Sequence, residues 1–282
     1  YGVPVIYDMQ SSLPEQLGKH RAARGRWAQW LLRTIEAWLL RRVDTVVSSA
    51  GLLQRVAALA PATPAREWHF PIDPAAPSIG GAAARRRELG IAPEASVVLY
   101  TGTFEPYQGL PLLLDAVPKV VAQVPGAVFV LVGGEGEGAD SVRRDAVRRG
   151  LNGSVRLLGR RPREEMPDFL AMADVLVSPR SYGGNLPLKV FDYLAAGRPI
   201  VATDVPSHRA MLDESRAVLA APTPDALASA IVALLGDPER AEGIARSGQA
   251  FADRHLGWHR FVQAVHAVYH GVAQRAGARV LA

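Results

Sequence analysis

The sequence contains no cysteine and no long apolar run. Without cysteine the chain can form no disulfide and offers no thiolate for catalysis or metal binding. No apolar stretch reaches the roughly 20 residues that a membrane-spanning helix needs. These two absences leave the compartment open, and our expectation is the cytoplasm.

Several catalytic signatures are absent as well. The glycine-rich residues 133–138, GGEGEG, lack the spacing of the dinucleotide-binding fingerprint, and no acidic residue follows at the expected distance. No Walker lysine follows a glycine run, and no Gly-x-Ser-x-Gly elbow is present. Two histidine pairs are spaced by four, His255 with His259 and His266 with His270. No carboxylate or cysteine completes a metal site with them, so we expect a solvated helix face and no metal.

The basic residues of the chain are mostly dispersed arginines. The formal net charge is +5, but basic and aromatic residues are not interleaved as single-stranded nucleic acid prefers. We therefore expect no nucleic-acid partner. A basic balance also suits anionic small molecules or an anionic membrane surface.

From residue 96 onward, apolar strand-like runs alternate with helical segments. The runs VVLYTG, AVFVLVGG, VRLLG and VLVS are each followed by a segment of helical periodicity. Such alternation predicts right-handed crossovers and a parallel sheet covered on both faces. The residues after 239 are predicted to be helical to near the end of the chain.

Residues 25–42, GRWAQWLLRTIEAWLLRR, are predicted to form a long helix with three tryptophans on one broad face. These are Trp27, Trp30 and Trp38. Two interpretations remain open. We favour a helix packed on a sheet, with the tryptophans in the core; the alternative is a helix that lies in a membrane interface and makes peripheral contact through them.

Residues 175–204 form the segment around which the rest is organised. They read as strand, glycine loop, helix and strand, and a glycine loop before a helix can hold an anion. Ligands of open parallel sheets bind beyond the carboxyl ends of the strands. Four consecutive strand ends are polar or glycine-rich here, at 102–103, 133–136, 159–162 and 180–185. The sequence therefore predicts a ligand cleft at this edge.

These landmarks carry a family resemblance. The stretches RRVDTVVSS, LYTGTFEPYQGLPLLLDA, VFVLVGGEGE, VRLLGRRPREEMPDFLAMADVLVSPR and GGNLPLKVFDYLAAGRPIVATD, with the late helix and GWHRF, occur in order between residues 44 and 258. Together they resemble the retaining glycosyltransferases of family 4. The resemblance implies an α/β fold of the GT-B type, with two Rossmann-like domains, the second a doubly wound parallel sheet, and C-terminal helices.

The resemblance also implies a division of the chain. Residues 1–74 would be the C-terminal portion of an acceptor-side Rossmann-like domain, and a connector rich in proline, glycine and alanine follows. Residues 75–255 would bind the nucleotide-sugar donor, and residues 256–282 would form a helix that packs back on the first domain. Because the chain begins at Tyr1 within the approach to a strand, we expect a fragment or a processed chain.

Implied roles follow position by position. The resemblance implies metal-independent transfer without a cofactor, with the nucleotide-diphosphate sugar as the donor substrate. Asp192 would bind the donor ribose, and the glycine loop would offer backbone groups to the diphosphate. The implied donor-binding residues are Gly102, Thr103, Gln108, Gly133, Glu135, Arg160, Arg161, Gly184, Asn185, Leu186, Pro187 and Asp192.

The sequence also departs from the family pattern. Gly184 stands where the family has an acidic residue, and the neutral Thr103 and Gln108 stand where an arginine and a lysine clamp the diphosphate. A leaving diphosphate needs positive charge. We therefore hypothesise that Arg180 and Lys189 are the catalytic cations; the alternative is that both are surface charges.

Three functions remain in view. The leading one is transfer of a hexose-type sugar to a carbohydrate or lipid-linked acceptor, in the cytoplasm, with the inner face of the membrane as the more specific location. The second is a non-catalytic nucleotide-sugar-binding module or an inactive fragment, which the neutral Thr103 and Gln108 favour. A sugar-phosphate epimerase of similar fold is weaker, because no acid–base pair marks the cleft.

Overall fold

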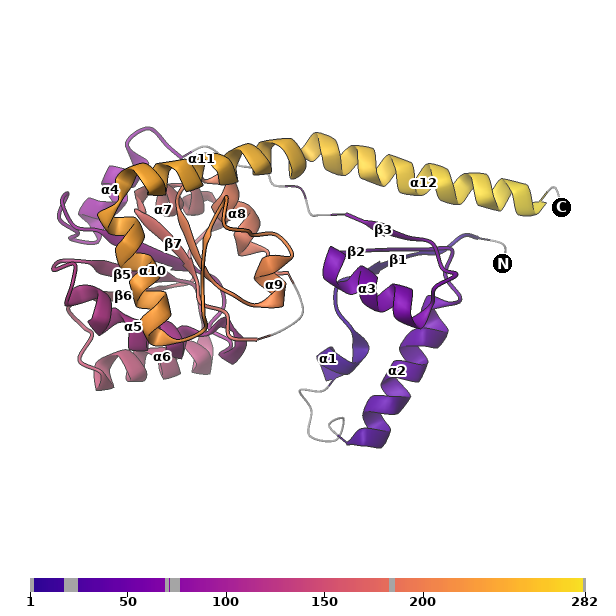
Figure 1. Cartoon of the computed structure of the whole chain (residues 1–282), viewed down its shortest axis with the longest axis horizontal. Coiled ribbons are helices and arrows are strands. Elements are labelled where there is room, and N and C mark those ends of the chain that lie inside the picture. Colours follow the sequence, from indigo (N-terminus) through magenta and orange to yellow (C-terminus); the bar gives the residue numbers. More distant parts are fainter. Residues whose placement is uncertain (1–2, 18–24, 69–70, 72–76, 183–185, 281–282) are drawn as a thin grey trace. The chain divides into compact units, whose positions relative to one another are not determined.

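The computed structural model describes residues 3–17, 25–68, 71, 77–182 and 186–280. These residues form two compact units (Figure 1). The first unit holds the described residues up to Pro71, Leu186 and those from Leu256 onward; the second holds 77–182 and Pro187–His255. The sequence placed its first domain boundary after residue 74, which lies outside the described residues.

The second unit is built on one six-stranded sheet. Its order is β6-β5-β4-β7-β8-β9, and every neighbouring pair is parallel. The strands are β4 (Val97–Thr101), β5 (Val128–Val132), β6 (Val155–Gly159), β7 (Val175–Ser178), β8 (Ile200–Thr203) and β9 (Val218–Ala220). The parallel α/β sheet predicted from the alternation of strands and helices is confirmed.

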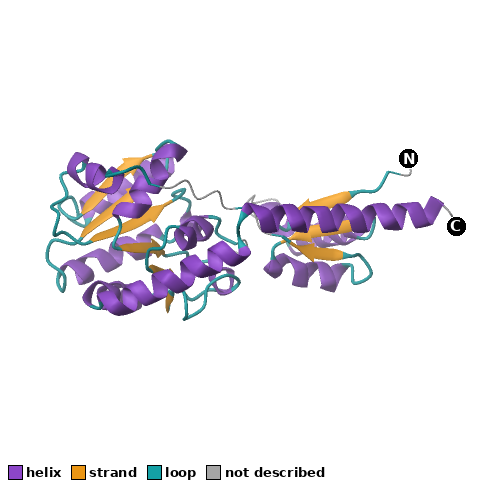
Figure 2. Cartoon of the chain, turned by 90° about the horizontal axis from the view of Figure 1, so that it is seen from above, coloured by secondary structure: helices purple, strands orange, loops and turns teal. Residues whose placement is uncertain are grey.

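Helices cover both faces of this sheet (Figure 2). Helix α5 (Leu110–Val121) packs against α10 (Pro224–Gly236), and α4 (Gly81–Glu88) packs against α7 (Met166–Met172). The others are α6 (Gly136–Arg148), α8 (Lys189–Ala195), α9 (Pro206–Arg209) and α11 (Pro238–His255). Because both faces are covered, strand residues such as Val98, Tyr100 and Phe129 are fully buried.

The first unit has a smaller parallel sheet of order β1-β2-β3. Its strands are β1 (Ile6–Met9), β2 (Thr45–Ser48) and β3 (Ala65–Glu67), and its helices are α1 (Leu13–Leu17), α2 (Arg26–Leu40), α3 (Ala50–Leu59) and α12 (Trp258–Val280). Helix α12 lies along one side of the sheet and α3 along the other (Figures 1 and 2). Arg275 of α12 donates to Thr45 Oγ1, and the rings of Phe261 and Trp68 are in contact.

Helix α2 corrects one interpretation. Trp27, Trp30 and Trp38 are 84, 60 and 51% exposed, so the favoured placement of these tryptophans in the core is wrong. The helix instead turns Glu36, Ala37 and Leu40 inward. Helical periodicity shows which residues share a face, but it does not show which face meets the sheet. Among the described helices, none is long and apolar enough to cross a membrane.

Candidate functional site

The strand order creates a switch point between β4 and β7. The chain leaves β4 toward β5 and β6 on one side of the sheet and continues with β7, β8 and β9 on the other. A cavity of about 1000 Å³ opens beyond the carboxyl ends of β4, β5 and β6, and this volume suits a small-molecule ligand. Six residues of the predicted donor site line it: Gly102, Thr103, Gly133, Glu135, Arg160 and Arg161.

Two glycines allow the strand ends to meet at this cavity. Gly102 and Gly133 have φ angles of 134° and 118°, which side-chain-bearing residues rarely adopt. A Cβ atom on Gly133 would lie only 2.1 Å from the carbonyl oxygen of Gly102. The absence of a side chain at Gly133 is therefore a steric requirement of the strand ends themselves, and the predicted donor contacts of both glycines stay predictions.

Lys189 lies beside Gly102, which lines the cavity, but Lys189 is not itself a lining residue, and neither are Gln108, Arg180 and Asp192. Its Nζ atom donates to Gln108 Oε1 at 2.9 Å, and Gln108 Nε2 donates to Thr103 Oγ1 at 3.3 Å. The same amine is 3.8 Å from the ring centroid of Tyr100. A Cβ atom on Gly102 would lie 3.0 Å from Nζ. The fold thus brings together Thr103 and Gln108 from the segment after β4 and Lys189 from the start of α8.

The surroundings of Lys189 disfavour its charged form. Burial lowers the pKa of Lys189 well below its ordinary value, and the nearby Arg180 guanidinium lowers it further. Within the described part of the chain, no carboxylate offsets these two effects. An entering anion would supply the missing negative charge, so the arrangement is suited to binding a phosphate group.

Arg180 is placed differently. It is only 5% exposed, its Nε donates to the carbonyl oxygen of Tyr182 at 3.0 Å, and its guanidinium carbon is 5.0 Å from the ring centroid of Tyr107. Gly109 packs on the same loop, since a Cβ atom there would lie 1.8 Å from the carbonyl oxygen of Pro179. Arg180 therefore ties the loop after β7 to the loop after β4, and its charge acts from within the protein.

The segments after β5 and β6 contribute Glu135, Arg160 and Arg161 to the lining of the cavity. Arg160 Nη1 lies 3.7 Å from Glu135 Oε1, and both side chains are exposed. Arg161 is half-buried, and its Nε has no hydrogen-bond partner among the residues that the structure describes. This buried donor is available to a ligand in the cavity, whereas the exposed pair can rearrange.

The glycine loop is only partly described. Gly184 and Asn185 lie outside the described residues, while Leu186 is half-buried and the buried Pro187 accepts a hydrogen bond from Val190 N. Asp192 lies one turn after Lys189 on α8. Partial desolvation raises the pKa of Asp192, and the Arg163 guanidinium opposes that shift. The predicted diphosphate and ribose contacts of this segment stay predictions.

The sequence reasoning missed a buried polar cluster behind the site. His208 Nε2 is 2.8 Å from Ser178 Oγ, and its Nδ1 is 2.7 Å from the carbonyl oxygen of Thr203. A carbonyl oxygen only accepts, so Nδ1 carries the proton and Nε2 accepts from Ser178. Burial lowers the pKa of His208 to about 4. Thr203 Oγ1 also donates to the carbonyl oxygen of Arg180, so the cluster fixes the start of the loop after β7. The sequence pattern that could have indicated this cluster is the polar residue at the end of each apolar strand, Ser178 in β7 and Thr203 in β8.

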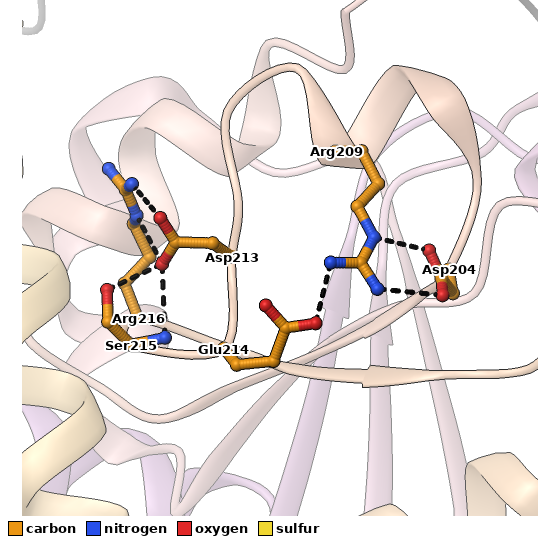
Figure 3. A network of polar contacts seen from close by, with 6 residues as sticks. All are labelled: Asp204, Arg209, Asp213, Glu214, Ser215 and Arg216. Carbon is orange, nitrogen blue, oxygen red and sulfur yellow. Dashed lines mark hydrogen bonds and ion pairs between the residues drawn. The ribbon is translucent and has the colours of Figure 1, made fainter.

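A network of ion pairs holds the segment after β8 (Figure 3). Arg209 donates to both carboxylate oxygens of Asp204 and to Glu214, and Arg216 donates to Asp213. The Arg209 partner lowers the pKa of Asp204, and the Arg216 partner lowers that of Asp213. These pairs brace the turn that carries His208.

Metal binding was not expected. Within the described ranges, no group of three or more His, Asp or Glu side chains could hold a metal ion. Metal independence stays a prediction, and the histidines of the tail are not part of such a group.

The family match lies almost entirely in the second unit, which holds the cavity. The family model described as glycosyl transferases group 1 matches residues 95–237. The D-inositol 3-phosphate glycosyltransferase of Segniliparus rotundus is 30% identical over 204 residues, which is 71% of this chain and 45% of the relative. The phosphatidyl-myo-inositol mannosyltransferase of Mycobacterium tuberculosis is 31% identical over 198 residues, 68% of this chain and 51% of the relative. The chain spans about half the length of these relatives.

Solved structures share the fold over nearly the whole chain. Sucrose-phosphate synthase from Thermosynechococcus elongatus has a TM-score of 0.80 at 21% identity and covers 96% of this chain and 68% of its own. Anabaena Alr3699/HepE in complex with UDP and glucose has a TM-score of 0.79 at 19% identity and covers 96% and 71%. The predicted α/β fold of the GT-B type is confirmed.

Proposed function

The chain belongs to the glycosyl transferases group 1 family, and from that premise we propose that it transfers a sugar from a nucleotide-diphosphate sugar to an acceptor. The observation that carries this proposal is the cavity of about 1000 Å³ at the switch point, with the amine of Lys189 beside Gly102 of its lining. Retention of configuration and transfer of a hexose are part of the proposal.

Lys189 has the central role in the proposed chemistry. When the bond between the sugar carbon and the diphosphate oxygen breaks, the diphosphate leaves with the bonding electrons and gains negative charge. The acceptor hydroxyl oxygen bonds to the sugar carbon, and its proton passes to the departing phosphate oxygen. A cation placed where this charge develops stabilises the transition state. The neutral Thr103 and Gln108 cannot provide it. Gln108 instead accepts a hydrogen bond from the amine and holds it beside Gly102.

The remaining roles are assigned around this contact. Arg161 would donate its unpaired Nε–H to the nucleotide, and Asp192 would accept from the ribose. The residues Gly184, Asn185, Leu186 and Pro187 would face the diphosphate. Arg180 would position the loop through Tyr182 and add positive potential. No metal or cofactor is required in this scheme.

The acceptor is proposed to be a carbohydrate or a lipid-linked sugar. The relatives reported above are named for inositol phosphate and phosphatidyl-myo-inositol acceptors, which supports a small polyol or a lipid headgroup. We place the reaction in the cytoplasm, at the inner face of the membrane.

A second function is favoured by a specific observation. Thr103 and Gln108 leave the usual clamp positions neutral, so the chain could bind nucleotide sugars without turning them over. The same measurement separates the two functions. Full-length protein is incubated with UDP- and GDP-sugars, and released nucleotide is measured beside binding by calorimetry. If the protein binds a nucleotide sugar but releases no nucleotide with any of the acceptors tested, the non-catalytic binding module is supported.

Lysine substitution tests the proposed chemistry. Lys189→Ala should lower nucleotide release by about 100-fold, in line with loss of one transition-state donor. Lys119→Ala is the matched control, because Lys119 lies on the surface of α5 and pairs with Asp225. It should behave as wild type. Release by Lys189→Ala equal to that of the control would contradict the proposal.

A further inference from the structure

We propose that the outward face of α2 binds an anionic lipid surface. The tryptophan face, as we call it, consists of Trp27, Trp30, Leu31, Ile35, Trp38 and Leu39, all of which are exposed large apolar side chains. Their spacing of three and four places them on one side of the helix. The proposal concerns a surface distant in sequence from the donor site and does not depend on the donor chemistry.

The polarity of α2 is inverted relative to an ordinary surface helix. The inward side carries Glu36, which is only 3% exposed, accepts from the backbone N–H of Leu13 and pairs with Arg55. A surface helix normally turns its apolar stripe inward and its charges outward. Here a carboxylate is bonded inside the unit while tryptophans face solvent, which marks the outer face as a binding surface.

Positive charge flanks the tryptophan face at the two ends of the helix. Arg26 is the first residue of α2, and Arg41 and Arg42 follow its last residue. Arg33 lies on the side of Leu40 and is not part of this face. Residues 25–43 contain four basic residues and one acidic residue, the buried Glu36, so this described segment alone carries a net charge of +3.

These charges identify the occupant. A second copy would bring the same positive segments together, and like charges in an isologous contact repel. An anionic bilayer offers negative headgroups to arginine and an interface in which tryptophan rings are favoured. The guanidinium of Arg42 lies 4.3 Å from the ring centroid of Trp38, so one cation already sits beside an interfacial ring.

The geometry also indicates how the helix would lie. Helix α2 has 15 residues, about 22 Å at the α-helical rise, and one of its sides is packed in the unit. It would therefore rest in the plane of the interface with only its outer face immersed.

The test is vesicle co-sedimentation of the full-length protein. Vesicles of phosphatidylcholine alone are compared with vesicles that contain phosphatidylglycerol. We expect binding to the anionic vesicles and at least tenfold weaker binding to the neutral ones. The triple variant Trp27→Ala/Trp30→Ala/Trp38→Ala should lower anionic binding at least tenfold. Trp258→Ala is the matched control, since Trp258 is 62% exposed on α12, and it should bind as wild type.

Other outcomes would overturn the proposal. Equal binding to both vesicle types would remove the anionic-lipid assignment. A dimer in light scattering that dissociates in the triple variant would identify a second copy as the occupant. A lower unfolding temperature in the triple variant, without any change in vesicle binding, would mean that the protein itself covers the face. UDP and GDP binding should be unchanged in every variant, so failure here is separable from failure of the proposed transfer.

Discussion

The two units of this protein invert the usual distribution of residues in opposite ways. In the second unit, the side chain of Arg180 is buried and Lys189 is half-buried, and desolvation together with the nearby Arg180 lowers the pKa of Lys189. In the first unit, Trp27, Trp30 and Trp38 face the solvent. Desolvated charge and exposed aromatic surface both raise the free energy of the isolated protein.

Each inversion can be relieved by a partner of the matching chemistry. A phosphate group offsets a buried cation, and a membrane interface accepts an exposed tryptophan. The two units therefore lack different partners. The second unit lacks negative charge beside its cations, and the first unit lacks an apolar environment for its tryptophans. Substitutions in each unit should therefore have different signatures in stability.

The largest effect is expected where the loops of the donor site meet. Gly109→Ala requires a positive φ of 74° and places Cβ 1.8 Å from the carbonyl oxygen of Pro179. We expect a loss of unfolding free energy on the order of 3 kcal/mol or more, measured by urea denaturation. Gly150→Ala is the matched control, with φ of 70° and open space around its Cβ, and should lose only about 1–2 kcal/mol. Equal losses would mean that the loop contact is not rigid.

An intermediate effect is expected from the buried imidazole. The pKa of His208 is lowered from 6.5 to about 4, by burial first and by Arg180 and Lys189 next, against the hydrogen bond to Thr203. The neutral ring is therefore fully compatible with folding above pH 6.5. Between pH 6.5 and 4 the unfolded chain binds a proton that the folded chain does not, so stability falls as pH falls. The shift corresponds to about 3 kcal/mol.

The check is the pH dependence of urea denaturation in wild type and His208→Gln. The variant should lack this component, so the difference in unfolding free energy between the two proteins should shrink as pH falls from 7 to 4.5. A difference that stays constant would show that His208 titrates in the folded state near its ordinary value.

The smallest effect is expected on the exposed face of the first unit. Trp27→Ala removes a side chain that is 84% exposed and contacts the ring of Trp30, so the unfolding free energy should change by only about 0.5 kcal/mol. Phe129→Ala in the core of the second unit should lose about 3–5 kcal/mol. A large loss for Trp27→Ala in thermal denaturation would mean that the face is covered by the protein.

The architecture of the second unit could be predicted from the sequence because strand and helix periodicities are local patterns. Alternating strand and helix periodicities predict parallel crossovers, and the rule for strand ends places Gly102, Gly133 and Arg160 at one edge. Those residues do line one cavity. What the periodicity of α2 could not supply was its rotation about its own axis, because tertiary packing decides which face is buried.

Contacts between residues far apart in the sequence could not be predicted either. Lys189 and Gln108 are 81 positions apart, and no sequence pattern near either residue predicts its contact with the other. The link between Ser178 and His208 is similar, since a single histidine after a strand has many possible environments. Such contacts follow from loop packing, which short-range sequence patterns do not encode.

The hydrogen bond between Lys189 and Gln108 has an evolutionary consequence. The amine and the amide oxygen occupy one small space, 2.9 Å apart. A lysine at position 108 would bring a second ammonium group into that space, and two like charges there repel. The two positions are therefore epistatic: a lysine suits either one or the other, and restoring the usual residue at 108 becomes favourable only after position 189 has changed.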